Sequence, residues 1–116
     1  MSGIKRTEAD RWFSMCVRER AGWTCERCGK QYPEESAAGL DCSHIYGRAN
    51  YGVRYHPDNC LAHCRGCHQY LSANPMLFTK HALEVVGHGA LELVEERKNC
   101  ATSGKGYRTS RVQREI

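Results

Sequence analysis

Cys25-Glu26-Arg27-Cys28 and Cys64-Arg65-Gly66-Cys67 are the two short stretches that decide the fold of this 116-residue chain. Each is a Cys-x-x-Cys turn that aims both sulfur atoms at one point, so two such turns complete a tetrahedral zinc site. Four thiolates leave no coordination position open, which predicts a structural ion. A thioredoxin-like redox pair is the alternative, but two pairs without a strand–helix context disfavour it. His63 is a possible competing ligand.

The chain contains eight cysteines, which in a short domain indicate either disulfides or metal binding. The first residues lack the apolar stretch of a signal peptide, and the mean hydropathy is −0.66. We therefore expect no membrane span and a cytoplasmic location, where metal binding is the better explanation. Cys16 falls in an apolar helical stripe and is expected in the core. For Cys42, Cys60 and Cys100 we favour small, partly buried apolar roles over a second metal site.

Apolar periodicity and turn residues predict helices around a short β-hairpin. Thr7 can cap the first helix with Asp10 as a capping-box partner, and Gly22 can end it. Asn74-Pro75 marks the start of a later helix, and Gly87 marks its end. The apolar stripe expected for the first helix consists of Ala9, Trp12, Phe13, Cys16 and Val17. The expected elements are a helix over 7–21, strands over 40–46 and 53–55, a short helix after Cys67, and helices over about 76–86 and 90–99.

These elements predict one α+β domain over residues 1–100. It consists of the N-terminal helix 7–21, a zinc-stabilised core over 23–73, and helices within 75–99. Residues 101–116 are polar and basic, and we expect them to form a flexible tail.

The positive charge of the chain is concentrated at its C-terminal end. The formal net charge is +4, whereas residues 97–116 alone carry a net +5, so residues 1–96 carry −1. A polyanionic partner is plausible, although net charge alone does not establish it. The basic residues of this stretch are Arg97, Lys98, Lys105, Arg108, Arg111 and Arg114.

The chain between the cysteine pairs contains Asp41-Cys42-Ser43-His44-Ile45-Tyr46-Gly47-Arg48, and later Asp58-Asn59-Cys60. His68 directly follows the second pair. A histidine at a strand end, an asparagine after the returning strand and a histidine after a Cys-x-x-Cys pair resemble the HNH endonucleases, which have the ββα-metal fold. The resemblance implies that His44 is the general base, that Asn59 braces the hairpin loop and orients the base, and that His68 binds a catalytic Mg²⁺ or Mn²⁺.

Phosphodiester hydrolysis explains why these residue types are needed. The reaction requires an activated water, a counter-charge for the phosphate and a stabilised leaving oxygen. Histidine titrates near neutrality and can accept the proton of the water. Arg48 could contact the scissile phosphate through its planar guanidinium. Many HNH enzymes have a metal-binding aspartate before the base, but Ser43 stands there in this chain. Asp41 lies on the same strand face and is a weak substitute.

A closer resemblance is to the NinG/Rap recombination endonucleases of lambda-like phages. It rests on Ala9-Asp10-Arg11-Trp12-Phe13-Ser14, on His44 to Arg48, and on Leu71-Ser72-Ala73-Asn74, and covers roughly residues 8–99. It implies branched or recombining phage DNA as the substrate class. One departure from that family is His68, where an asparagine often follows the second pair.

Two other functions compete with the nuclease. One is a non-catalytic nucleic-acid-binding module stabilised by zinc, which the basic tail would serve equally well. The other is a protein-interaction adaptor that docks through helices 75–99, which nothing specific supports. The remaining histidines have the ordinary interpretation of structural residues: His56, His63, His81 and His88. DNA is the expected partner, and the oligomeric state is left open.

Overall fold

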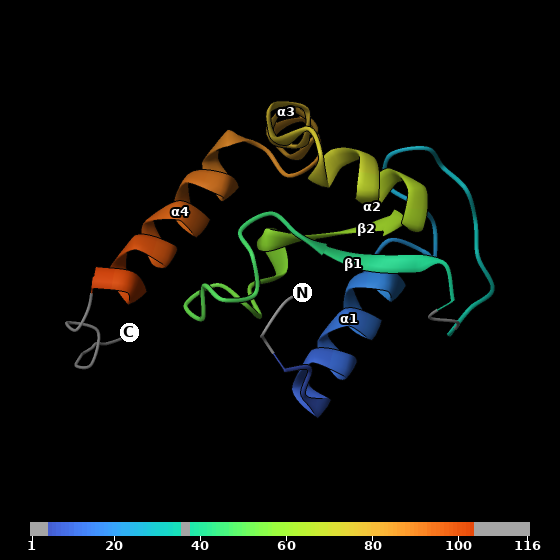
Figure 1. Cartoon of the computed structure of the whole chain (residues 1–116), viewed down its shortest axis with the longest axis horizontal. Coiled ribbons are helices and arrows are strands. Elements are labelled where there is room, and N and C mark those ends of the chain that lie inside the picture. Colours follow the sequence, from blue (N-terminus) through green and yellow to red (C-terminus); the bar gives the residue numbers. More distant parts are fainter. Residues whose placement is uncertain (1–4, 36–37, 104–116) are drawn as a thin grey trace.

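The centre of the fold is an antiparallel two-stranded sheet (Figure 1) in a computed structural model that describes residues 5–35 and 38–103. Strand β1 spans Leu40–His44 and strand β2 spans Cys60–Cys64. Most of the expected tail, residues 104–116, lies outside the described residues. The paired residues are Leu40 and Cys64, Asp41 and His63, Cys42 and Ala62, Ser43 and Leu61, and His44 and Cys60.

The register divides the side chains of the sheet between two faces, because successive residues of a strand point to opposite sides. One face carries Cys42 and His44 from β1 with Cys60 from β2, and helix α1 packs on it. The other face carries Asp41 and Ser43, and helices α2 and α3 lie on that side (Figure 1). The two faces therefore present different chemistry to the two layers of helix.

The returning strand predicted over residues 53–55 is wrong. Residues 51–55 form turns, the one-turn 3₁₀ helix η1 spans Pro57–Asn59, and β2 starts only at Cys60. Three residues offer little pairing, whereas Cys60–Cys64 is a five-residue run whose first four members are buried. The first strand also ends at His44, two residues earlier than predicted.

Helix α1 spans Glu8–Arg20 and begins as the sequence predicts. The Thr7 hydroxyl accepts from the Asp10 amide, and the Asp10 carboxylate accepts from the Thr7 amide, so the capping box is confirmed. The chain leaves the helix through Gly22, whose φ of 67° favours glycine.

The expected core position of Cys16 is wrong, because its side chain is exposed. Trp12 of the same predicted stripe is 56% exposed. The side of α1 that is buried carries polar residues instead, at the helical spacing of one face. These are Asp10, Ser14 and Arg18, with Val17 as the apolar member.

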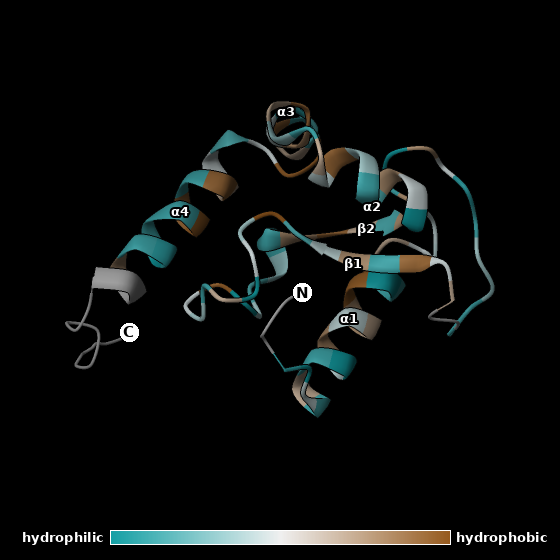
Figure 2. Cartoon of the chain, viewed as in Figure 1, coloured by the Kyte–Doolittle hydropathy of each residue, from teal (hydrophilic) through white to brown (hydrophobic). Residues whose placement is uncertain are grey.

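Three further helices follow β2 within the described residues: α2 over Arg65–Ser72, α3 over Pro75–Val85 and α4 over His88–Ser103. The proline start of α3 is confirmed, and Gly87 adopts a φ of 101° between α3 and α4. Helix α4 begins two residues before the predicted start and continues to Ser103. Figure 2 shows hydrophilic residues along much of α4, while Leu91 and Val94 are buried.

The main apolar core lies between α1, the sheet and the first cysteine turn. Its buried members are Val17, Cys25, Leu40, Cys60, Ala62 and Cys67. The predicted α+β class is therefore confirmed. Among the described helices, none combines the length and apolar character that crossing a membrane requires.

Candidate metal centre and histidine site

The two Cys-x-x-Cys turns converge as the sequence predicts. The sulfur atoms of Cys25, Cys28, Cys64 and Cys67 all lie within 4.8 Å of one another, a group that could hold one metal ion. Cys64 ends β2 and caps α2, and its sulfur accepts from the Cys67 amide at 3.4 Å. The Cys25 sulfur accepts from the amides of Arg27 and Cys28 at 3.4 and 3.5 Å. This four-cysteine site ties the loop after α1 to the junction of β2 and α2.

The protonation of the four-cysteine site is compatible with zinc. Burial raises the pKa of Cys25, but backbone N–H donors outweigh it and hold the value at about 7. Burial raises the pKa of Cys67 to about 12, and a bound metal ion would favour loss of this proton by stabilising the thiolate. The Arg27 guanidinium donates to the Cys67 sulfur at 3.4 Å, which favours the thiolate. The donors are those that zinc prefers in a closed structural site.

His63 does not join this site. It is fully buried on the opposite face of the sheet, and its Nε2 lies 2.9 Å from Nε2 of His81 on α3. Its ring also packs against Phe78 with centroids 5.9 Å apart. These contacts fit the interpretation of His63 and His81 as structural residues.

His44 lies at the end of β1, on the face covered by α1. Its Nε2 is 3.0 Å from the carbonyl oxygen of Arg54. A carbonyl oxygen can only accept, so Nε2 carries the hydrogen and Nδ1 keeps a free lone pair. Burial lowers the pKa of His44, which keeps the ring neutral at pH 7. The arrangement supplies a neutral nitrogen base with a fixed tautomer.

Asn59 fixes the loop that contains this carbonyl. Its side-chain nitrogen donates to the carbonyl oxygens of Tyr46 and Val53, each at 3.0 Å. Its side-chain oxygen accepts from the Tyr46 amide at 2.8 Å. The residue is fully buried, so these bonds replace hydration that the amide has lost. These bonds link Tyr46 to Val53 and hold the loop next to His44 in place.

His68 and Asp41 meet on the other face of the sheet. His68 Nδ1 is 2.9 Å from Asp41 Oδ2, and Arg65 Nε lies 3.0 Å from the same oxygen. Arg65 and His68 lower the pKa of Asp41 against the opposing effect of burial. Ser43 is fully buried on this face, and its Oγ has no hydrogen-bond partner within the described structure. The fold thus brings together Asp41 and His68, which the sequence analysis treated as candidate ligands of one ion, and it joins them by a hydrogen bond.

The structure does not bring His44 to that pair, because His44 and Asp41 point to opposite faces of β1. The donors around His68 also do not fit Mg²⁺ or Mn²⁺, which bind several oxygen ligands. The single carboxylate there is already paired with Arg65 and His68. Within residues 5–35 and 38–103, no group of three potential ligands includes His68. We therefore assign no catalytic step to an ion at this position.

Arg48 is held by the start of α1. Its Nη2 lies 3.2 Å from Asp10 Oδ2 and donates to the Lys5 carbonyl at 3.1 Å. Arg54 pairs with the same carboxylate, with Nε 2.9 Å from Oδ1, and both Arg54 and Asp10 are only 5% exposed. Sequence analysis missed this buried cluster, because capping alone accounted for Asp10. A phosphate contact by Arg48 would compete with its bond to Asp10.

The Asp10 cluster leads to a stability prediction. Asp10→Asn leaves the buried Arg54 cation without its counter-charge, which is expected to cost about 3 kcal/mol in urea unfolding at pH 7. Glu8→Gln on the same helix turn, whose side chain is 75% exposed, is the matched control and should unfold like the wild type.

The same cluster sets a pH dependence. The hydrogen bond from Arg54 holds the pKa of Asp10 far below its usual 3.8. The resulting stability is fully present above this unfolded value and is lost as the pH falls below about 4. The Asp10→Asn variant should lack this part of the pH dependence. Equal stability of variant and wild type at pH 7 would show that the buried pair contributes nothing.

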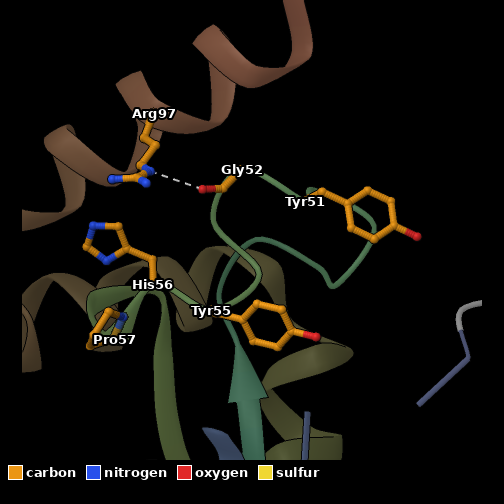
Figure 3. A pocket seen from close by; sticks show the side chains of 6 residues that line it. All are labelled: Tyr51, Gly52, Tyr55, His56, Pro57 and Arg97. Atoms are coloured by element: carbon orange, nitrogen blue, oxygen red, sulfur yellow. Dashed lines mark hydrogen bonds between the residues drawn. The ribbon is translucent and has the colours of Figure 1, made fainter. Parts of the chain in front are cut away.

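The loop braced by Asn59 also borders an open hollow against α4 (Figure 3). Arg97 of α4 donates to the Gly52 carbonyl at 3.2 Å and lies next to His56 in this view. Tyr51 and Tyr55 point away from Arg97, and they are 69% and 41% exposed. The hollow thus combines a cation with exposed aromatic rings close to the carbonyl that orients His44.

Comparison with known proteins leaves the site to be interpreted from its geometry: no family model, curated protein or solved structure matches the chain.

Cys42 and Cys60, to which the sequence analysis assigned no chemical role, lie beside His44. Cys42, His44 and Cys60 place their ligand atoms within 4.8 Å of one another. The spacing of Cys42 and His44 was a signal, since residues two apart share a strand face. Cys60 could not be placed, because the returning strand was predicted at 53–55.

Proposed function

We propose that the protein is a metal-dependent DNA endonuclease of the HNH type, with a ββα-metal core and His44 as its general base. The observation that carries the proposal is the hydrogen bond between His44 and the Arg54 carbonyl. It leaves one ring nitrogen unprotonated in a side chain that burial keeps neutral. The two cysteine turns, one before β1 and one after β2 in the chain, and the Asn59 brace support the same proposal.

In this proposal, Nδ1 of His44 accepts a proton from the water that attacks phosphorus. A new P–O bond forms to the water oxygen, the bond to the leaving sugar oxygen breaks, and that oxygen takes a proton from solvent. The imidazolium that results keeps its Nε2–H bond to the Arg54 carbonyl, which strengthens as the ring becomes charged. Asn59 acts as a positioning residue, since it holds the loop that bears this carbonyl. The divalent cation implied by the resemblance would supply counter-charge, and it has no assigned ligands here.

A non-catalytic DNA-binding module is the second candidate. The observation that favours it is the separation of His44 from Asp41 and His68 by the sheet. The ion pair between Arg48 and Asp10 also favours this candidate, because the guanidinium proposed to contact the phosphate is already paired with a carboxylate. Binding through the basic C-terminal stretch requires neither feature.

The deciding experiment is a cleavage assay with supercoiled plasmid, linear duplex and a four-way junction, each with Mg²⁺ or Mn²⁺. Nicked or linear products that disappear with EDTA support the nuclease. Preferential cleavage of the junction supports branched or recombining phage DNA as the substrate. DNA binding without cleavage under every metal condition overturns the nuclease in favour of the binding module.

The C-terminal stretch is expected to provide much of the DNA affinity. Truncation after Ser103 removes Lys105, Arg108, Arg111 and Arg114 together with Glu115, a net charge of +3. If the four cations contact phosphates, the slope of log K against log salt should become less steep by about 3 to 4. Fluorescence anisotropy at several NaCl concentrations measures this slope.

The matched control keeps the chain length and replaces the same four cations with glutamine. This variant should lose affinity as the truncation does, because charge is the property at issue. An unchanged affinity and salt slope in both variants would show that this stretch does not contact DNA.

A further inference from the structure

A second group of metal-binding side chains lies on the face of the sheet covered by α1. His44 pairs with Cys60 across the strands, and Cys42 precedes His44 by two residues on the same face. Their ligand atoms all lie within 4.8 Å of one another. We propose that Cys42, His44 and Cys60 bind a second zinc ion, separate from the four-cysteine site.

The donor types select zinc among the common cations. Two sulfurs and one imidazole nitrogen suit Zn²⁺, whereas Mg²⁺ and Ca²⁺ prefer oxygen ligands. Two thiolates also neutralise the charge of the ion, which matters because Cys60 is fully buried. Three protein ligands leave the fourth position of a tetrahedral ion to water. The proposed site is therefore open, unlike the four-cysteine site.

The surroundings of His44 and Cys42 favour metal binding by these two side chains. The Arg54 carbonyl accepts from Nε2 of His44 at 3.0 Å, which leaves Nδ1 as the ligand atom. Metal-bound histidines usually make such a bond through their other nitrogen. Arg18 is 4% exposed, its charge acts on Cys42, and its Nε has no hydrogen-bond partner in the described structure. A thiolate at Cys42 would therefore also stabilise a buried cation.

The two metal sites lie at opposite ends of the sheet. Cys60 begins β2 and Cys64 ends it. Four residues of extended strand correspond to about 13 Å between the two positions. Two ions at this separation do not share ligands, so each site should load and empty independently.

Zinc at this second site would also regulate the proposed nuclease, and this consequence rests on the proposed function. Nδ1 of His44 has one lone pair, which can accept a proton or bind zinc but cannot do both. Zinc should therefore inhibit cleavage by occupying the base. The ion at the four-cysteine site would have no such effect, because none of its ligands takes part in the reaction.

Metal stoichiometry tests the second site without reference to activity. Native mass spectrometry of the full chain, saturated with zinc under reducing conditions, should show two zinc ions per molecule. Cys42→Ala and His44→Ala should each retain one. Cys16→Ser removes an exposed cysteine and should retain both ions. Cobalt titration should show a second set of sulfur-to-metal absorption bands that is absent in Cys42→Ala.

One zinc ion in the wild type at saturation, or two ions in both Cys42→Ala and His44→Ala, would overturn the second site. Circular dichroism identifies variants that fail to fold, and cobalt binding by the wild type then decides the question alone. If cleavage is detected, the zinc concentration for half inhibition should rise at least tenfold in Cys42→Ala. If the stoichiometry is two but no cleavage occurs, the metal site stands and only the nuclease fails.

Discussion

Replacing His44 with alanine is expected to reduce DNA cleavage at least about a hundredfold, because general bases contribute about 10² to 10⁴ to such rates. The substitution removes the only assigned proton acceptor of the proposed reaction. In the part of the chain that the structure describes, the His44 ring is hydrogen-bonded to the Arg54 carbonyl and packs near Phe13 with centroids 6.3 Å apart. Conversion of supercoiled plasmid with time measures the effect.

Two further variants separate the chemistry of His44 from its packing. His44→Gln can still donate to the Arg54 carbonyl but has no nitrogen that accepts a proton at neutral pH, so it should be as inactive as alanine. His88→Ala replaces an exposed histidine at the start of α4 and should cleave like the wild type. The four-cysteine zinc should remain in all three proteins. Partial rescue of His44→Ala by added imidazole would identify a missing base.

The pH profile gives an independent measure of the same residue. Cleavage requires unprotonated His44, so the rate falls as the pH drops through its pKa. Burial lowers that pKa below the usual 6.5, and the acid limb should therefore lie below pH 6.5. The limb should disappear from any residual activity of His44→Gln. Wild-type rates in His44→Ala would show that another group is the base.

The parts of the fold that could be predicted from sequence are those specified by local chemistry. Thr7 and Asp10 form a capping box whatever the rest of the chain does, and Pro75 and Gly87 mark helix ends through their own backbone preferences. The convergence of the two cysteine turns was predictable for a similar reason, since a four-thiolate site defines its own geometry.

Strand pairing was not predictable in the same way. Val53–Tyr55 contains a β-branched and an aromatic residue, whereas no strand was predicted over Cys60–Cys64. The register is needed to show that His44 lies opposite Cys60, whereas the opposite orientations of Asp41 and His44 follow from strand alternation alone. The grouping of Cys60 with Cys42 and His44 depended on this register. Long-range pairs such as Asp10 with Arg54, 44 residues apart, likewise leave no periodic signal.

Removing the four-cysteine site should unfold the domain. Zinc binding in structural sites is worth about 10–16 kcal/mol, which is comparable to the whole stability of a typical domain, about 5–15 kcal/mol. The described residues contain a single sheet of two strands, which is marginal without further support. The site supports it by joining the Cys25 turn to the junction of β2 and α2.

The direct test is Cys25→Ser, because this sulfur belongs to a residue that is 1% exposed and part of the apolar core. We expect loss of the tightly bound zinc and of the cooperative thermal transition, measured by metal analysis and circular dichroism. Prolonged treatment of the wild type with a strong chelator should give the same result, reversed by added zinc.

Cys16→Ser is the matched control, since it removes an exposed sulfur outside both metal groups and should melt like the wild type. Cys42→Ala should keep the four-cysteine zinc and a cooperative transition, because the second site is open and the ligands of the first are untouched. A Cys25→Ser protein with wild-type zinc content and melting temperature would show that the two cysteine turns do not bind a structural ion. The fold would then depend on the apolar core between α1 and the sheet, and the convergence of the four sulfurs would be a consequence of that packing.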